Sequence, residues 1–174
     1  MPVVQEIKGP HLVTVPKSTL GNWEREFGRW FPKLRVLKFY GNKEERELQR
    51  AQDLTFDGFD VCLTTYEMVI TEKAALGQFS WEYLIIDEAH RIKNEDSALA
   101  QIVRTYNTKC RLLITGTPLQ NNLHELWALL NFLLPDVFSD SAQFEQYSNA
   151  VGEVSERVSL YIQTPLPASY TLYI

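Results

Sequence analysis

The 174-residue sequence has few cysteines, no long apolar run and no excess of positive charge. Cys62 and Cys110 are far apart and lack the CxxC spacing of zinc sites, which argues against a disulfide framework and favours a reducing, intracellular compartment. The longest apolar runs, such as residues 83–86, fall far short of the roughly 20 residues of a membrane span. Residues 1–10 also lack the basic segment followed by an apolar segment that a secretory signal has, so no membrane partner is expected.

The charge balance is mildly acidic. There are 17 Lys and Arg against 22 Asp and Glu, which gives a formal net charge of -5. This excludes a generic basic coat for nucleic acid, but it leaves room for a local phosphate site. Hydrophobic residues make up 45% and charged residues 22%, which is ordinary for a globular domain with a sizeable core.

Short apolar runs alternate with helical patterns through most of the chain. Continuous apolar strands separated by helices favour a parallel sheet covered on both faces, and thus an α/β fold. We expect strands at residues 11–15, 34–40, 59–65, 83–87 and 111–115, and helices at 19–31, 43–52, 67–76, 97–106, 123–134 and 141–147.

Three stretches have simple interpretations. Trp23, Phe27 and Trp30 recur at helical spacing and are expected to lie in the core. The run 43–50 mixes both charge signs and predicts a solvated helix face. In residues 148–174 the alternation stops, so we expect a domain over 1–147 followed by a divergent linker or disordered tail.

The strand at 83–87 runs into Asp87-Glu88-Ala89-His90. Two adjacent carboxylates at the end of a buried strand are costly unless a cation or water network compensates them. Mg²⁺ on Asp87 would supply that compensation, and Glu88 could then polarise a water for attack on a phosphate. An isolated Asp-Glu pair would indicate only solvated acids, but the apolar strand and the full four-residue string favour a catalytic role for Asp87 and Glu88.

A second polar segment, Thr115-Gly116-Thr117-Pro118-Leu119-Gln120, follows the last predicted strand. Gly116 permits a tight backbone path, while the hydroxyls and the Gln120 amide can relay hydrogen bonds. One strand-helix-strand unit separates this segment from Glu88, so both should lie at the same edge of the sheet. Alone, it would indicate an ordinary strand-to-helix turn.

Two further strand ends carry donors suited to phosphates. Pro16, Lys17 and Ser18 precede a helix and form a plausible phosphate site. Thr64, Thr65 and Tyr66 end the third strand and could contact a nucleic-acid backbone. Simple helix capping by Thr65 explains the second set equally well.

Taken together, these strings resemble the first RecA-like lobe of SWI/SNF-type chromatin-remodelling ATPases of helicase superfamily 2, and most of all the imitation-switch group. Residues 83–136 carry most of the resemblance, with 11–23 and 60–68 adding to it. The resemblance covers about residues 7–147 and implies a RecA-like parallel sheet flanked by helices.

The resemblance also implies roles for the residues. Asp87 and Glu88 match the DEAH-box pair that handles Mg²⁺, through water, and activates the attacking water. His90 and Gln120 would connect the nucleotide site to a second RecA-like lobe. Thr115, Gly116 and Thr117 would couple hydrolysis to movement. The DNA backbone would be contacted by Pro16, Lys17, Ser18, Thr64, Thr65 and Tyr66.

By the same resemblance, the implied activity is ATP-driven translocation on duplex DNA in the nucleus. ATP and Mg²⁺ would be the cofactors, and nucleosomes would be slid. Remodeller subunits would be further partners, which the sequence does not identify.

The sequence departs from the family pattern in one respect that matters for chemistry. It has no Gly-Lys dipeptide, so the family's phosphate loop would precede residue 1, and the second lobe with its arginine finger is absent. We therefore expect an incomplete lobe without the phosphate-loop strand, inactive alone, with an apolar sheet edge beside the strand ending at Thr115. The alternative is a catalytically inactive product that acts as a DNA- or partner-binding module.

Overall fold

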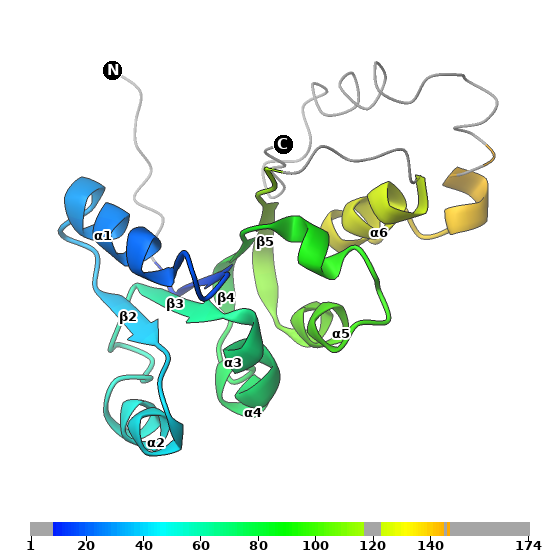
Figure 1. The fold of residues 1–174 in the computed structure, drawn as a ribbon. Helices are drawn as coiled ribbons and strands as arrows, with labels where there is room; N and C mark the ends of the chain where they lie inside the picture. The colour runs from blue at the N-terminus through cyan, green and yellow to red at the C-terminus, as the bar shows by residue number, and fades with distance from the viewer. Residues whose placement is uncertain (1–8, 117–122, 145, 147–174) are drawn as a thin grey trace.

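Five parallel strands form one sheet in the order β2-β3-β1-β4-β5 (Figure 1). The computed structural model describes residues 9–116, 123–144 and 146. The strands are β1 (His11–Val15), β2 (Val36–Phe39), β3 (Val61–Thr65), β4 (Trp81–Ile86) and β5 (Thr108–Leu113). The helices are α1 (Leu20–Trp30), α2 (Lys43–Gln52), α3 (Tyr66–Thr71), α4 (Lys73–Leu76), the 3₁₀ helix η1 (Ala89–Ile92), α5 (Ala98–Thr105) and α6 (Leu123–Leu133). The predicted α/β fold with a parallel sheet is confirmed.

β1 lies at the centre of the sheet. Val13 is in register with Leu63 of β3 on one side and with Ile85 of β4 on the other. Successive side chains of a strand point to opposite faces, so β1 contributes to two separate cores. Leu12 joins the core beneath α3, α5 and α6, whereas Val13 joins the core beneath α1. Helices therefore cover both faces, as the continuous apolar strands predict (Figure 1).

Several element boundaries differ from the predicted ones. β5 begins at Thr108, earlier than residue 111, because Thr108 pairs with Trp81 at the start of β4. The predicted helix 67–76 is divided into α3 and α4 at Glu72. The expected last helix is helical at residues 141–144. Trp30 was expected in the core, but it lies near the end of α1 with 63% of its surface exposed.

The edge of the sheet beyond β4 is formed by β5, within the part of the chain that the structure describes. Arg111 projects from β5, donates to the Phe132 carbonyl at 2.7 Å and stacks its guanidinium 4.7 Å from the Phe132 ring.

None of the described helices is both long and apolar enough to span a bilayer.

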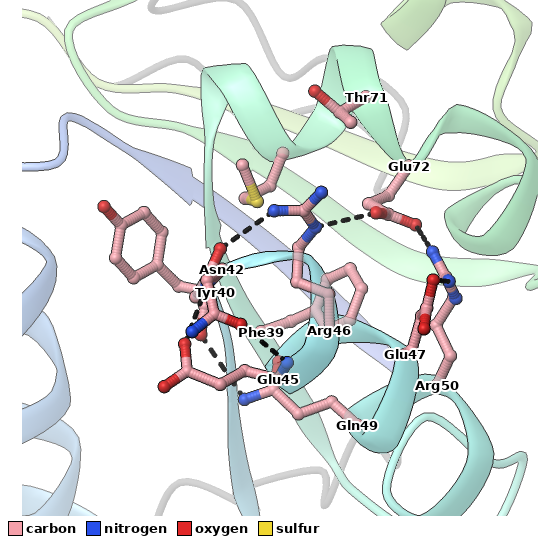
Figure 2. A network of polar contacts seen from close by, with 12 residues as sticks. Phe39, Tyr40, Asn42, Glu45, Arg46, Glu47, Gln49, Arg50, Thr71 and Glu72 are labelled. Carbon is pink, nitrogen blue, oxygen red and sulfur yellow. Dashed lines mark hydrogen bonds and ion pairs between the residues drawn. The ribbon is translucent and has the colours of Figure 1, made fainter.

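α2 is the most polar helix and is held to the domain by charge. None of its residues is buried, which confirms the predicted solvated face. Its start is fixed by a capping box in which Asn42 and Glu45 exchange hydrogen bonds (Figure 2). Arg46 and Arg50 of α2 then bind the carboxylate of Glu72, at 2.8 and 2.5 Å (Figure 2).

Glu72 is the buried centre of this network, with 6% of its surface exposed. Burial would raise the pKa of this carboxyl, but the hydrogen bonds from Arg46 and Arg50 outweigh burial and hold the pKa below its ordinary value of 4.5. The Glu72 carboxylate, between α3 and α4, therefore holds α2 to the domain, although α2 buries none of its own residues.

We predict that Glu72→Gln lowers the free energy of unfolding by about 2 kcal/mol, because charge-assisted hydrogen bonds to both arginines are weakened. Urea denaturation followed by circular dichroism measures the change. Glu47→Gln is the matched control, since Glu47 lies 4.0 Å from Arg50 with half of its side chain exposed. Equal effects of the two substitutions would contradict the anchoring role of Glu72.

The same pair of proteins tests the pH dependence. Because the pKa of Glu72 is lowered by folding, its contribution is complete above the ordinary pKa and is lost as pH falls through the lower, folded value. The stability difference between the native chain and Glu72→Gln should therefore shrink as pH is lowered below about 4.5.

Candidate functional site

Four chemically distinctive segments meet at one edge of the sheet. All five strands run in the same direction, so the residues that follow β1, β3, β4 and β5 emerge together. In open parallel sheets this carboxyl edge is where ligands bind. Residues 16–18, 87–90 and 115–116 follow β1, β4 and β5. Residues 64–66 span the end of β3, which ends at Thr65.

Asp87 is the residue on which these segments converge. It is half-buried, and its backbone N–H donates to the Thr14 carbonyl of β1 at 2.9 Å. Its Oδ1 accepts from the Glu88 N–H at 3.0 Å, and its Oδ2 accepts from the indole Nε1–H of Trp23 at 2.9 Å. Its carbonyl accepts a hydrogen bond from the Tyr66 hydroxyl. The plane of the carboxylate is thus set by one donor on each oxygen.

Glu88 follows in a left-handed backbone conformation, with φ of 51°. That conformation turns the chain into η1, where the Ala89 N–H donates to the Ile114 carbonyl at 2.9 Å. The buried Oε2 of Glu88 lies 3.3 Å from His90 Nδ1, and a methyl group added at Gly116 would lie 4.0 Å from its Oε1. The structure therefore brings Glu88, His90 and Gly116 together.

Of the second polar segment, the structure describes Thr115 and Gly116. Thr115 is half-buried and Gly116 is exposed. Thr117 and Gln120 lie outside the described residues, so their predicted roles stay predictions.

The segment after β1 presents its charge to solvent. Lys17 and Ser18 are exposed, and Pro16 is half-buried. The Nζ of Lys17 lies 5.4 Å from the centre of the Tyr40 ring, and contact with the Tyr40 hydroxyl raises the pKa of Lys17. This lysine therefore carries a full positive charge at neutral pH.

The segment after β3 is internal. The Thr64 hydroxyl is fully buried and donates to the Phe39 carbonyl at 2.7 Å. Thr65 accepts from the Met68 N–H at 3.4 Å and so caps α3, as the simpler interpretation of this segment held. Tyr66 is 7% exposed. The Thr64 and Tyr66 hydroxyls thus donate within the domain, and Thr65 is buried. A DNA contact here, which remains a prediction, would have to use backbone groups.

Trp23 is the site residue that sequence reasoning missed. We expected it to be a core residue, and its ring does pack beside Phe27, at 5.9 Å between ring centres. Its indole N–H, however, reaches Asp87. A buried or half-buried tryptophan usually finds a partner for its N–H, and this tendency was the only available signal.

The donor set suits a loosely held magnesium ion. No group of three or more Asp, Glu, His or Cys side chains that could hold a metal occurs among the described residues. Mg²⁺ keeps several waters and is commonly bound through one or two carboxylates plus substrate phosphates. Asp87, with free lone pairs on both oxygens, fits that arrangement.

Comparison with known proteins identifies the family. A model of the SNF2-related domain matches residues 3–160. The chain belongs to this family. The match extends beyond residue 147, where the sequence analysis placed the start of a divergent tail, and the domain boundary stays a prediction.

Relatives of this SNF2-related chain are chromatin-remodelling proteins by name. Over 147 residues it is 59% identical to the ISWI chromatin-remodeling complex ATPase CHR11 of Arabidopsis thaliana, covering 84% of this chain and 14% of that protein. Over 152 residues it is 56% identical to the human SWI/SNF-related matrix-associated actin-dependent regulator of chromatin subfamily A member 1, covering 86% and 15%. The chain thus spans a small part of these relatives.

A solved structure supports the same assignment. The Sulfolobus solfataricus SWI2/SNF2 ATPase core in complex with dsDNA matches with a TM-score of 0.72 and 28% sequence identity. The match covers 94% of this chain and 33% of that one. The SNF2-related chain therefore has the fold of part of an SNF2 ATPase core.

The backbone of Glu88 generates a prediction about stability. A left-handed conformation costs a non-glycine residue about 1–2 kcal/mol, whereas glycine costs about 0.5–1 kcal/mol through its greater freedom in the unfolded chain. Glu88→Gly should therefore leave the free energy of unfolding unchanged or raise it by about 1 kcal/mol, as measured by urea denaturation.

Glu95→Gly is the control for this substitution. Glu95 lies in the loop before α5, and among the described non-glycine residues only Glu88 has a positive φ. The control should lose about 0.5–1 kcal/mol. An equal loss in both variants would mean that Glu88 stores no backbone strain.

Proposed function

We propose that the chain is part of the nucleotide-hydrolysing lobe of an ATP-dependent DNA motor that remodels chromatin. The single observation that carries the proposal is the Asp87–Glu88 pair at the carboxyl end of β4, in a chain 59% identical to a chromatin-remodelling ATPase. The substrates are ATP with Mg²⁺, duplex DNA and nucleosomes, and the location is the nucleus.

The chemistry assigned to the site is attack of a water on the γ-phosphate. Glu88, which directly follows Asp87 beyond the end of β4, orients this water and accepts its proton. When bound, Mg²⁺ would neutralise phosphate charge, held through water by Asp87. His90 lies 3.3 Å from Glu88 and is assigned the contact with a second RecA-like lobe, and Thr115 and Gly116 are assigned the coupling of hydrolysis to movement.

DNA is assigned to the segment after β1. Lys17 and Ser18 are exposed at the turn into α1, and Lys17 is fully charged. A lysine beside a hydroxyl and a helix start suits a phosphate of the DNA backbone, which fixes position without reading sequence. The chain as a whole is acidic, with a formal net charge of -5, so this lysine would contribute a local positive charge.

The hydrolysis role is tested in the full-length motor. Glu88→Gln should lower the kcat of DNA-stimulated ATP hydrolysis by about 10²–10⁴-fold, because loss of a general base has that effect, while nucleotide binding is retained. Glu82→Gln is the matched control. Glu82 lies near the start of β4, the strand that leads to Glu88, and its carboxylate pairs with Lys109 at 2.7 Å, outside the site. A fully active Glu88→Gln motor would disprove the proposal.

The DNA role is tested by the salt dependence of binding. Lys17→Ala should weaken duplex binding equally for all sequences and reduce the slope of log affinity against log salt by about one, because one phosphate contact is lost. Lys33→Ala is the control, since Lys33 is exposed beyond the other end of α1. Identical slopes for the native protein and Lys17→Ala would exclude the contact.

A further inference from the structure

Asp87 is bound by side chains from two segments that lie next to the proposed DNA face. Trp23, on the first turns of α1, binds the carboxylate, and Tyr66, directly after β3, binds the backbone carbonyl. The two donors come from positions 64 and 21 residues before Asp87 in the chain. Neither hydrogen bond is needed to pair the strands or to cap a helix.

The connection from Lys17 to Trp23 is short and stiff. The backbone N–H and the hydroxyl of Thr19 both donate to the Pro16 carbonyl at 3.0 Å, which closes the turn that carries Lys17. The Trp23 N–H then donates to the Thr19 carbonyl at 3.0 Å. A continuous path of hydrogen bonds therefore runs from the turn at 16–18 through Trp23 to Oδ2 of Asp87.

The connection through Tyr66 is equally direct. Its hydroxyl donates directly to the backbone carbonyl of Asp87. Its ring also carries the guanidinium of Arg91, 5.3 Å from the ring centre. Tyr66 thus joins the end of β3 to the backbone of Asp87 and to the side chain of Arg91.

We propose that Trp23 and Tyr66 are positioning residues that couple DNA contact at residues 16–18 to the orientation of the Asp87 carboxylate. This inference rests on the function proposed above. A carboxylate with one donor on each oxygen has a fixed plane, and the Trp23 donor is the one that can move with the DNA face. Small displacements of a group that organises the reacting phosphate have large effects on rate.

The chain offers a matched control for each residue. Trp30 lies on the same helix as Trp23, and its indole N–H donates to Glu26 at 2.7 Å, outside the site. Tyr106 is buried like Tyr66, and its hydroxyl also donates to a backbone carbonyl, that of Val69, at 3.3 Å. Trp23→Phe with Trp30→Phe, and Tyr66→Phe with Tyr106→Phe, therefore compare the same chemical change inside and outside the proposed connection.

The experiment measures coupling in the full-length motor. The first readout is the ratio of DNA-stimulated to basal ATP hydrolysis. The second readout needs no turnover: it is the change in duplex affinity caused by a non-hydrolysable ATP analogue with Mg²⁺. Linkage requires that nucleotide and DNA alter each other's binding by the same factor.

We expect Trp23→Phe and Tyr66→Phe each to reduce both quantities about fivefold or more, the lower range of allosteric coupling, while Trp30→Phe and Tyr106→Phe change them less than about twofold. Because both bonds end on Asp87, the double variant should lose less than the product of the single losses. Equal effects in the test and control variants would overturn the inference. So would a proportional fall in basal and stimulated rates.

The outcomes separate this inference from the proposed function. If Glu88→Gln abolishes hydrolysis but Trp23→Phe and Tyr66→Phe behave as their controls do, only the coupling is wrong. If Glu88→Gln has no effect, the motor assignment itself fails. Should Trp23→Phe not fold, Tyr66→Phe, which removes a single oxygen atom, carries the test alone.

Discussion

The parallel pairing of β1 with β3 and β4 is the constraint on which the rest of the molecule depends. It brings the ends of three strands to one edge, so that Lys17, Tyr66 and Asp87 lie in neighbouring segments although the sequence separates them widely. It also fixes Asp87 directly, since the Asp87 N–H continues the β1–β4 ladder through the Thr14 carbonyl. The site is therefore an extension of the sheet, and its geometry follows from strand register.

The helices α1 and α2 are held to the sheet in different ways. α1 packs apolar side chains on Val13 and Leu63, and this burial is what brings Trp23 over the strand ends. On the side where the sheet ends in β2, α2 buries none of its residues and relies on Arg46, Arg50 and Glu72. Removing one partner of such a network leaves a charge without compensation, so the loss of Glu72 is expected to destabilise the domain.

The sequence predicted the fold well, because continuous apolar strands between helices allow few arrangements. All five strands and the start of α2 were located, and Asp87 and Glu88 were placed at a strand end. What failed depended on tertiary contacts. Glu72, at the break, binds two arginines of another helix, and the buried Thr64 hydroxyl binds the Phe39 carbonyl of β2. Trp30 is exposed at the end of α1. Periodicity within one segment contains no such information.

The hydroxyls of Thr64 and Tyr66, at the end of β3, are directed into the domain. A set of donors beside a strand end can bind a ligand or fix the neighbouring strand, and sequence alone does not distinguish the two uses. In this protein Thr64 and Tyr66 both donate to backbone carbonyls, of Phe39 and of Asp87. The segment therefore ties β2, β3 and the end of β4 into one rigid unit. The turn carrying Lys17 is an exposed part of this edge, and Trp23 is its one hydrogen-bonded connection, among the described contacts, to the Asp87 carboxylate.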